Sequence, residues 1–315
     1  MIKTSKYILS KAVILMCIAF FTHSCKDAEH NLIPNSNTED TDTIANNRQL
    51  PEQFKNYWYD GKAELTSYKL MQERYGEIRQ GMAVTIFVTE DFLPKEQVKA
   101  NSPSGKLVSV LKLNKTKKFT TGIYPYSIMT STFNPILKKQ HVLKISNSVQ
   151  EWCGQVYMQL NNRNDFNIIS HSYFEGEADQ QITLEKTWLE DELWNLIRIN
   201  PNELPTGDIN LIPSFEYLRL RHKDVKAYKA NAKLKKGDSL TKYDLVYPEL
   251  ERELIVYFNS SFPFEIEKWE ETNGTQTNDS IRLKTTAHKI KRLRTDYWNM
   301  NRNEDTGLRD TLGLK

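Results

Sequence analysis

The chain of 315 residues carries 43 basic and 40 acidic side chains, and 39% of its residues are hydrophobic. Three of the lysines and none of the acids lie in residues 1–24, so a chain that loses this stretch has 43 − 3 = 40 basic against 40 acidic residues. A balanced charge creates no overall field that attracts nucleic acid, and composition therefore gives no support for nucleic-acid binding.

Residues 1–24 have the layout of a secretory signal peptide: lysines, an apolar run from Ala12 to Phe21, and a small residue, Ser24. As a helix this run covers only about 15 Å, whereas a membrane span needs about 20 residues. The segment that ends in Ser24-Cys25 resembles the lipobox of bacterial lipoproteins. This resemblance implies a diacylglycerol-modified Cys25 and a membrane anchor. Cleavage nearby by an ordinary signal peptidase is the alternative.

Residues 25–50 follow as the acylated cysteine and a disordered tether, because the segment is rich in Asn, Thr, Asp and Ser. Its first residues, 26–29, resemble the surface-export signal of Bacteroidetes lipoproteins; simple solvation is the alternative. Residues 51–315 are predicted to form a single domain. Cys153 is the only thiol left there after processing, which excludes an intramolecular disulfide.

The predicted elements begin with a short helix that starts at Pro51 and ends before Gly61. Beyond Lys62 the dominant period is two, as at 156–160, 228–235 and 281–288, which predicts half-buried antiparallel strands. Further strands are expected near 63–72, 76–90, 118–133, 141–149, 165–184, 208–221, 241–247, 251–259 and 264–271. Helices are expected at 186–200 and at 91–100. The fold class is therefore all-β or β-dominated α+β, an antiparallel curved sheet or open half-barrel with two or three helices.

The segments 151–154, 172–179 and 213–219 carry a family resemblance. From about Phe54 onward the chain resembles a group of Bacteroidetes lipoproteins that often carry the label septum formation inhibitor Maf. Genuine Maf proteins are nucleotide pyrophosphatases with a Ser-x-Ser-Pro-Arg-Arg type segment, but here Ser102-Pro103 is followed by Ser104, so no residue role is carried over. The architecture is also similar to the half-barrel of lipoprotein-carrier (LolA/LolB-like) proteins, which hold acyl chains.

Two candidate sites follow from these elements. On a strand, His171, Glu175, Glu177 and Asp179 would share one face and could bind calcium or supply a glycosidase carboxylate. An ordinary acidic outer face is the alternative. A groove between the sheet and a covering helix would be lined by Leu189, Leu193 and Ile197, which a simple core helix would bury as well.

Three weaker candidates each have an ordinary structural explanation. Cys153 could act as a nucleophile beside His141 or His171, or be a small buried residue. The basic residues of 219–236 could bind an anion, or protect a sheet edge. The aromatic-proline segments 124–126 and 262–264 could cradle a ligand, or pack at corners, and either proline bond could be cis.

Four Asp-Ser/Thr-aliphatic segments resemble the O-glycosylation sites of exported Bacteroidetes proteins, with Thr43, Ser239, Ser280 and Thr311 as acceptors. Composition alone gives about one such match.

These observations favour a lipid-anchored protein of the outer membrane, facing either the cell surface or the periplasm. We expect a non-enzymatic binding or structural module that holds an apolar or glycan ligand, without cofactor or metal. The alternative is a glycan-directed hydrolase that uses the acidic cluster at 175–179. Strong catalytic motifs are missing from the sequence, which disfavours the enzyme. The oligomeric state is left open.

Overall fold

A computed structural model describes residues 47–274 and 282–314. The predicted signal peptide, Cys25 and most of the tether lie outside these residues, as do Thr43 and Ser280. Within them, no helix has both the length and the apolar character required to cross a membrane.

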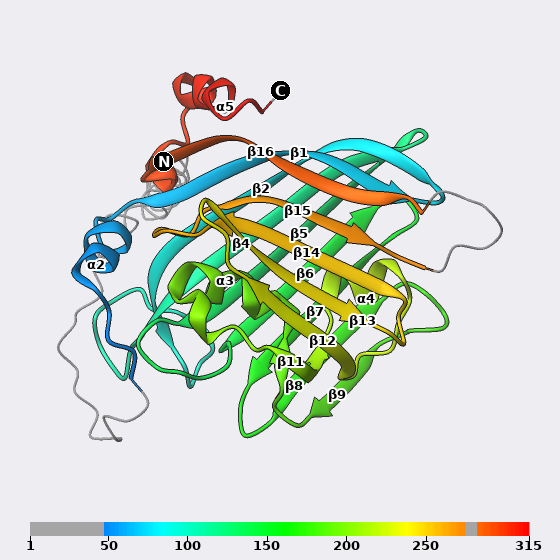
Figure 1. Ribbon diagram of the computed structural model, residues 1–315, viewed down its shortest axis with the longest axis horizontal. Helices are drawn as coiled ribbons and strands as arrows, with labels where there is room; N and C mark the ends of the chain where they lie inside the picture. Colours follow the sequence, from blue (N-terminus) through cyan, green and yellow to red (C-terminus); the bar gives the residue numbers. More distant parts are fainter. Residues whose placement is uncertain (1–46, 275–281, 315) are drawn as a thin grey trace, which may run out of the picture. The chain divides into compact units, whose positions relative to one another are not determined.

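Strands dominate the structure, with 53% strand and 15% helix (Figure 1). The helices are α2 (Glu52–Trp58), α3 (Glu190–Ile199), α4 (Phe215–Leu220) and α5 (Gly307–Thr311). The strands are β1 (Ala63–Arg74), β2 (Glu77–Leu93), β3 (Val98–Lys99), β4 (Val108–Thr121), β5 (Tyr124–Pro135), β6 (Lys144–Glu151), β7 (Gly154–Asn162), β8 (Phe166–Ser172), β9 (Gln180–Leu184), β10 (Trp188–Leu189), β11 (Gly207–Ile212), β12 (Tyr228–Lys235), β13 (Leu240–Tyr247), β14 (Arg252–Asn259), β15 (Ile266–Thr272) and β16 (Lys284–Thr295).

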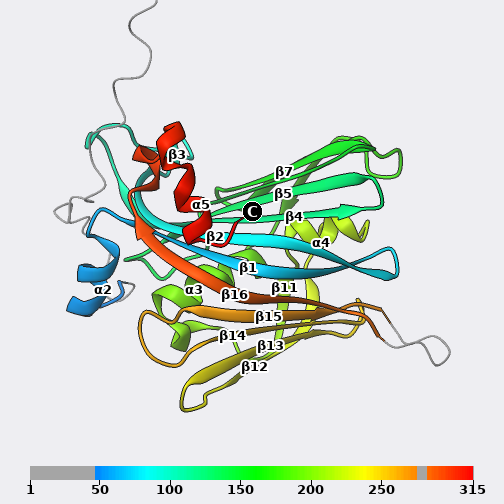
Figure 2. The ribbon, with the colours of Figure 1, turned by 90° about the horizontal axis from the view of Figure 1, so that it is seen from above.

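The sixteen strands of the described residues form one sheet, in the order β10-β11-β12-β13-β14-β15-β16-β1-β2-β4-β5-β6-β7-β8-β9, with β3 paired to β2. Every neighbouring pair is antiparallel except β10 and β11. The sheet curves strongly and stays open, with α3 and α4 on its concave side (Figure 2). The predicted fold class is confirmed.

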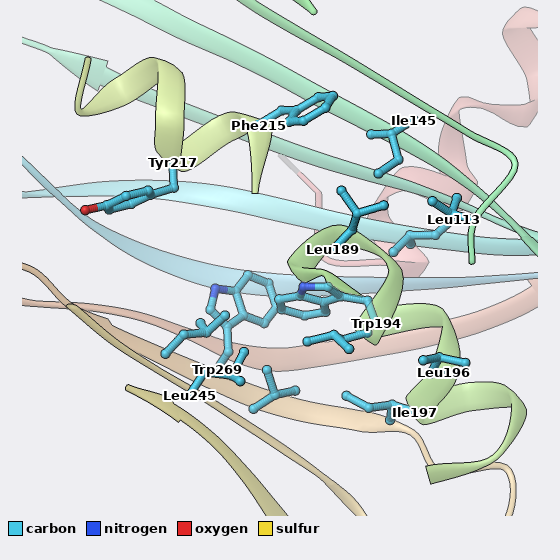
Figure 3. Close-up of a cluster of buried hydrophobic side chains, with 14 of the residues drawn as sticks. Leu113, Ile145, Leu189, Trp194, Leu196, Ile197, Phe215, Tyr217, Leu245 and Trp269 are labelled. Atoms are coloured by element: carbon cyan, nitrogen blue, oxygen red, sulfur yellow. The ribbon is translucent and has the colours of Figure 1, made fainter. Parts of the chain in front are cut away.

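The alternation of buried and exposed residues along the strands places the main core on the concave side. Helix α3 is buried all round, and its Trp194 meets Trp269 of β15 edge-on, with ring centroids 5.3 Å apart (Figure 3). Leu189, Leu193 and Ile197 are at most 2% exposed and belong to this core. They are therefore core residues, which agrees with a simple core helix, the alternative to a ligand groove.

Three consecutive acids at the start of α3 are buried, each with its own partners. Glu190 accepts hydrogen bonds from Arg252 and from the Tyr247 hydroxyl. Asp191 accepts from the backbone N–H of Phe215, and Glu192 accepts from the backbone N–H of Val142. Because each carboxylate bonds a different segment, the start of α3 is held against β13 and β14, against the segment that precedes β6, and against α4.

The other end of α3 is held by a buried ion pair. Arg198 donates to both carboxylate oxygens of Glu64 on β1, at 2.5 and 2.8 Å, and its Nε donates to the Pro263 carbonyl. Its guanidinium also lies over the rings of Trp58 and Phe87, 5.1 and 4.8 Å from their centroids. Both ionic side chains are at most 1% exposed, so neither charge has water as an alternative partner.

Several predicted elements are corrected by the structure. Residues 91–100 form no helix, because β2 continues to Leu93 and Pro94 disfavours helical backbone at the residue before it. Residues 215–220 of the predicted strand 208–221 are helix α4, which begins where the Ser214 hydroxyl accepts the Tyr217 N–H. The strand expected at 118–133 is the hairpin of β4 and β5, and 165–184 is interrupted between β8 and β9.

Candidate functional site

The interior of the sheet holds a cavity of about 20 Å³, too small for an organic ligand. It is lined by residues of α3, α4, β1, β4, β14 and β15, and many of these are charged, such as Lys117, Glu216 and Arg252. One water molecule needs roughly 10–15 Å³ by the same measure. This cavity therefore has the size and polarity of a buried water site.

A groove of about 350 Å³ lies on the convex face of the sheet, within the size range of ligand pockets, roughly 300–1,000 Å³. It crosses β2, β4, β5, β6 and β7, and the segment that contains β3 lines one side. Ten of its fourteen lining residues are polar or charged. The lining residues are Glu90, Phe92, Gln97, Val98, Lys99, Lys112, Asn114, Met129, Ser131, Phe133, Lys144, Ser146, Tyr157 and Gln159.

The register of the sheet assembles the floor of this outer groove. Asn114, Ser131, Ser146 and Gln159 lie directly opposite one another on β4, β5, β6 and β7. Neighbouring strands are about 4.8 Å apart, so this row of amides and hydroxyls extends for about 14 Å. The Ser131 hydroxyl donates to Asn114 Oδ1 at 2.7 Å. The row therefore presents hydrogen-bonding groups to a ligand lying across the strands.

A second row lies two residues further along the strands and adds charged and aromatic side chains. Lys112, Phe133 and Lys144 lie opposite one another on β4, β5 and β6. Lys112 Nζ donates to Glu90 at 3.0 Å and lies 5.9 Å from the centroid of the Phe133 ring. Burial and the charge of Arg163 lower the pKa of Lys144.

Two buried oxygens among the groove residues lack a hydrogen-bond donor. Glu90 is 6% exposed, and its Oε2 has no partner although Oε1 accepts from Lys112. Gln97 is 2% exposed, and its Oε1 has no partner although Nε2 donates to the Pro94 carbonyl at 2.8 Å. Buried acceptors are nearly always satisfied by protein, water or ligand. Both oxygens are enclosed by neighbouring protein atoms, so a donor reaches them only from within the protein.

Gln97 also has a strained backbone conformation, which indicates that specific contacts fix its position. Its φ is +63°, in the left-handed region that costs a non-glycine residue of order 1–3 kcal/mol. The segment around it is held by Lys144, which donates to the Gln97 carbonyl at 3.0 Å, and by Arg163, which donates to the Lys95 carbonyl. These bonds stabilise the strained backbone and keep Gln97 at the groove.

The chain matches no family model, no curated protein and no solved structure. The residues themselves must therefore carry the argument about function.

The predicted carboxylate cluster does not lie on one strand. Strand β8 ends at Ser172, and residues 173–179 form a loop in which Ala178 has a φ of +52°. His171 and Asp179 pair at 3.3 Å, both largely exposed, while Glu175 is exposed. The two-residue spacing of Glu175, Glu177 and Asp179 predicts a strand, but these residues lie in a loop and do not share one face. Among the described residues, no group of three His, Cys, Asp or Glu side chains is arranged to hold a metal ion.

Glu177 is the member of the cluster with defined partners. It accepts from the Ser172 hydroxyl at 2.5 Å, and its other oxygen lies 2.5 Å from His222 Nδ1. The carboxylate lies between the hydroxyl and the imidazole. An activated serine needs the opposite order, with the hydroxyl on the imidazole. This arrangement does not favour nucleophilic catalysis.

Cys153 is exposed in the turn between β6 and β7. A hydrogen bond with the Glu151 carboxylate raises the pKa of its thiol, which works against thiolate formation. His141 instead contacts Glu192 at 2.8 Å, and His171 contacts Asp179. The predicted neighbours of a nucleophilic thiol are thus engaged elsewhere, and the idea of a small buried cysteine was also wrong.

The basic residues of 219–236 do not form one patch. Arg219 is buried, whereas Lys229, Lys233 and Lys235 lie exposed on β12. Strand β12 pairs with β11 over residues 228–232 and with β13 over residues 231–235, so each of these lysines lies where the strand has a paired neighbour on one side only. The Phe262-Pro263 bond is cis, and the Phe262 ring packs against the core.

Two of the predicted O-glycosylation acceptors lie among the described residues. Ser239 lies exposed in the turn before β13, and Thr311 lies exposed at the end of α5.

The outer groove was missed by the sequence reasoning. Alternation within each strand identifies Asn114, Ser131, Ser146 and Gln159 as outward-facing residues. It does not say that they lie opposite one another, because register depends on turn lengths and on the packing of the other face. The clustering of hydroxyls and amides at outward positions of successive strands was the only available signal.

Proposed function

We propose that the protein is a non-enzymatic carbohydrate-binding module of the cell envelope and that an oligosaccharide lies across the outer groove. The observation that supports this most strongly is the row Asn114, Ser131, Ser146 and Gln159 in a groove of about 350 Å³. Sugars offer hydroxyl donors and acceptors along their length. Such groups match the amides and hydroxyls of the row.

A hydroxylated ligand fits this groove better than an acyl chain does. Phe92, Val98, Met129 and Phe133 are the apolar residues of the lining, and the other ten residues are polar or charged, with carbon atoms of their side chains adding to the apolar surface. An acyl chain would remove water from these polar groups without returning hydrogen bonds, at a cost of about 1–3 kcal/mol for each buried group. The concave side, where a carrier half-barrel would hold acyl chains, is filled by α3, α4 and core side chains (Figure 3).

The outer groove has too few carboxylates for hydrolysis of a glycan, which favours binding alone. Glycosidases of the usual kind place two carboxyl groups on either side of the scissile bond. Glu90 is the single carboxylate among the residues that line the outer groove, and it is paired with Lys112. The hydrolase that would use residues 175–179 remains the second candidate, and loss of a glycan-cleaving activity on Glu177→Gln would establish it.

A matched pair of glutamines on β7 tests the groove. Gln159 lines it, whereas Gln155, four residues earlier on the same outward face, does not. With an oligosaccharide array to identify a ligand for the purified full chain, Gln159→Ala is expected to weaken binding by about 5- to 10-fold, because it removes one hydrogen-bonding group worth about 1 kcal/mol. Gln155→Ala should bind within 2-fold of wild type.

Ser146→Ala and Ser148→Ala form a second matched pair on β6, because Ser146 lines the groove and Ser148 does not. Ser146→Ala should weaken binding and Ser148→Ala should not. Equal affinities of all four variants and wild type in isothermal titration would contradict the proposed site. Turnover of the bound glycan by wild type would contradict the non-enzymatic proposal.

The location of the protein is proposed from the residues before the described domain. Ser24-Cys25 after an apolar run supports acylation of Cys25 and anchoring in the outer membrane. Metabolic labelling with a palmitate analogue is expected to mark wild type and to leave Cys25→Ala unlabelled. Equal labelling of both chains would exclude the anchor.

A further inference from the structure

The most exposed apolar side chains of the described residues gather at one end of the sheet. Ile123 is 82% exposed, Tyr173 71%, Trp152 68% and Tyr75 58%, and no other large apolar side chain exceeds 46% in the described ranges. They lie in the connections β4–β5, β8–β9, β6–β7 and β1–β2. The strand register brings these four connections to the same end. We call this end the aromatic end.

The aromatic end lies opposite the point where the described chain begins. Helix α2 precedes the first residue of β1, and the β1–β2 turn follows its last residue, twelve residues later (Figure 1). The exposed rings are also ordered against neighbours. Trp152 stacks on Tyr124 with centroids 6.5 Å apart, and the ring of Tyr173 lies so close to Gly154 that a Cβ there would come within 2.7 Å of it. Glycine at position 154 is therefore required by this ring.

Two buried arginines lie behind these rings with unused donors. Arg74 donates from Nη1 to the Leu220 carbonyl and from Nη2 to the hydroxyls of Tyr75 and Tyr126, but its Nε has no acceptor. Arg219 is 4% exposed, and both its Nε and its Nη1 have no acceptor. Unsatisfied charged donors are costly inside a protein. Arg74 lines the cavity of about 20 Å³ described above, where a buried water molecule can accept from it, whereas Arg219 does not line this cavity and calls for another acceptor.

The nearby carboxylates do not meet this need. Glu151 Oε1 is 4.0 Å from Arg219 Nη2, which is beyond hydrogen-bond distance, and Glu151 Oε2 accepts the Cys153 N–H at 2.7 Å. Glu177 is engaged by Ser172 and His222. Burial lowers the pKa of Arg219, and the charge of Arg74 lowers it further against the opposing effect of Glu177. Arg74 Nη1 donates to the carbonyl of Leu220, the residue next to Arg219, so both cations belong to this end of the fold and a bound anion there would offset their charge.

We propose that the aromatic end binds an acidic saccharide, with its carboxylate or phosphate group on Arg74 and Arg219 and its sugar ring against Trp152 and Tyr173. Guanidinium groups are the preferred partners of such oxyanions. The ring of Phe174 covers Arg219, 4.1 Å from its Cζ atom, so binding requires the loop 173–179 to move. This site is separate from the outer groove and does not depend on the function proposed for it.

Titration calorimetry of the purified full chain with trigalacturonate, and with maltotriose as the neutral comparison, tests the proposal. Wild type should bind trigalacturonate and not maltotriose at this site. Arg219→Gln should weaken the binding of trigalacturonate by at least about 10-fold, as expected for loss of a charge-assisted hydrogen bond. Lys223→Gln, which removes an exposed cation four residues away, should change it less than 2-fold.

Trp152→Ala tests the contact with the sugar ring. Trp152 is largely exposed, so removing its side chain leaves the core intact. We expect it to weaken binding as well, and circular dichroism should confirm that all variants are folded. Equal binding by wild type, Arg219→Gln and Trp152→Ala would overturn the proposal, as would equal binding of both sugars or binding to phosphatidylglycerol vesicles alone. Weaker trigalacturonate binding by Gln159→Ala together with unchanged binding by Arg219→Gln would place this sugar in the outer groove and would also overturn the proposal.

Discussion

Arg198→Met is expected to lower the free energy of unfolding by about 3 kcal/mol, because it leaves the buried carboxylate of Glu64 with Arg292, 3.9 Å away, as its remaining cation. Glu64 is 0% exposed, and the Arg198 guanidinium bonds both of its oxygens. Methionine keeps much of the volume and the contacts with Trp58 and Phe87. The loss is therefore electrostatic and is not the loss of a well-packed side chain. Urea unfolding of the purified chain, followed by circular dichroism, measures it.

The double variant Arg198→Met/Glu64→Leu distinguishes a lost pair from lost packing. Removing both charges leaves no buried ion, so the double variant should recover most of the stability lost in the single one. Arg302→Met is the control. Arg302 pairs with Glu304 while both are more than 70% exposed, and the change should stay within about 0.5 kcal/mol. A cost below 1 kcal/mol for Arg198→Met would contradict the importance assigned to the pair.

Asp191→Asn is expected to stabilise the protein at neutral pH and to have little effect near pH 4. Burial, opposed by Lys115 at 3.9 Å, raises the pKa of Asp191 from 3.8 to about 6. The folded chain thus holds this proton more tightly than the unfolded chain does. The stability from this group is fully present below pH 3.8 and is lost as the pH rises through about 6. The difference between the two pKa values corresponds to about 3 kcal/mol.

Asparagine retains an oxygen that can accept the Phe215 N–H and carries no charge to desolvate. The unfolding free energy of Asp191→Asn minus that of wild type should therefore rise from near zero at pH 4 to about 3 kcal/mol at pH 7.5. Measuring both chains at each pH cancels the titration of all other groups. Asp238→Asn, at an exposed turn position, should show a flat difference. A constant difference for Asp191→Asn across this range would show that the carboxylate carries no burial penalty.

The candidate sites could be predicted only in part, for a reason visible in particular residues. Glu190, Asp191 and Glu192 are typical of a solvated first turn of a helix, and nothing local indicates that all three are buried. Their partners Arg252, Phe215 and Val142 are between 24 and 62 residues away. Likewise, Arg74 and Arg219 are 145 positions apart, and α4 reaches Arg74 only through its packing inside the curved sheet, where Arg74 donates to the Leu220 carbonyl.

The sequence by itself determined the β-dominated class and the faces of the strands, because side-chain direction in a strand alternates with a period of two regardless of the rest of the fold. It did not determine where regular structure stops. Residues 173–179 share the two-residue spacing of a strand but form a loop, and residues 215–220 form a helix that begins at Ser214. The tertiary structure alone decided the strand register, and with it both proposed sites. A row such as Asn114 to Gln159 exists only after four strands align, and alignment depends on turns and core packing far from the row.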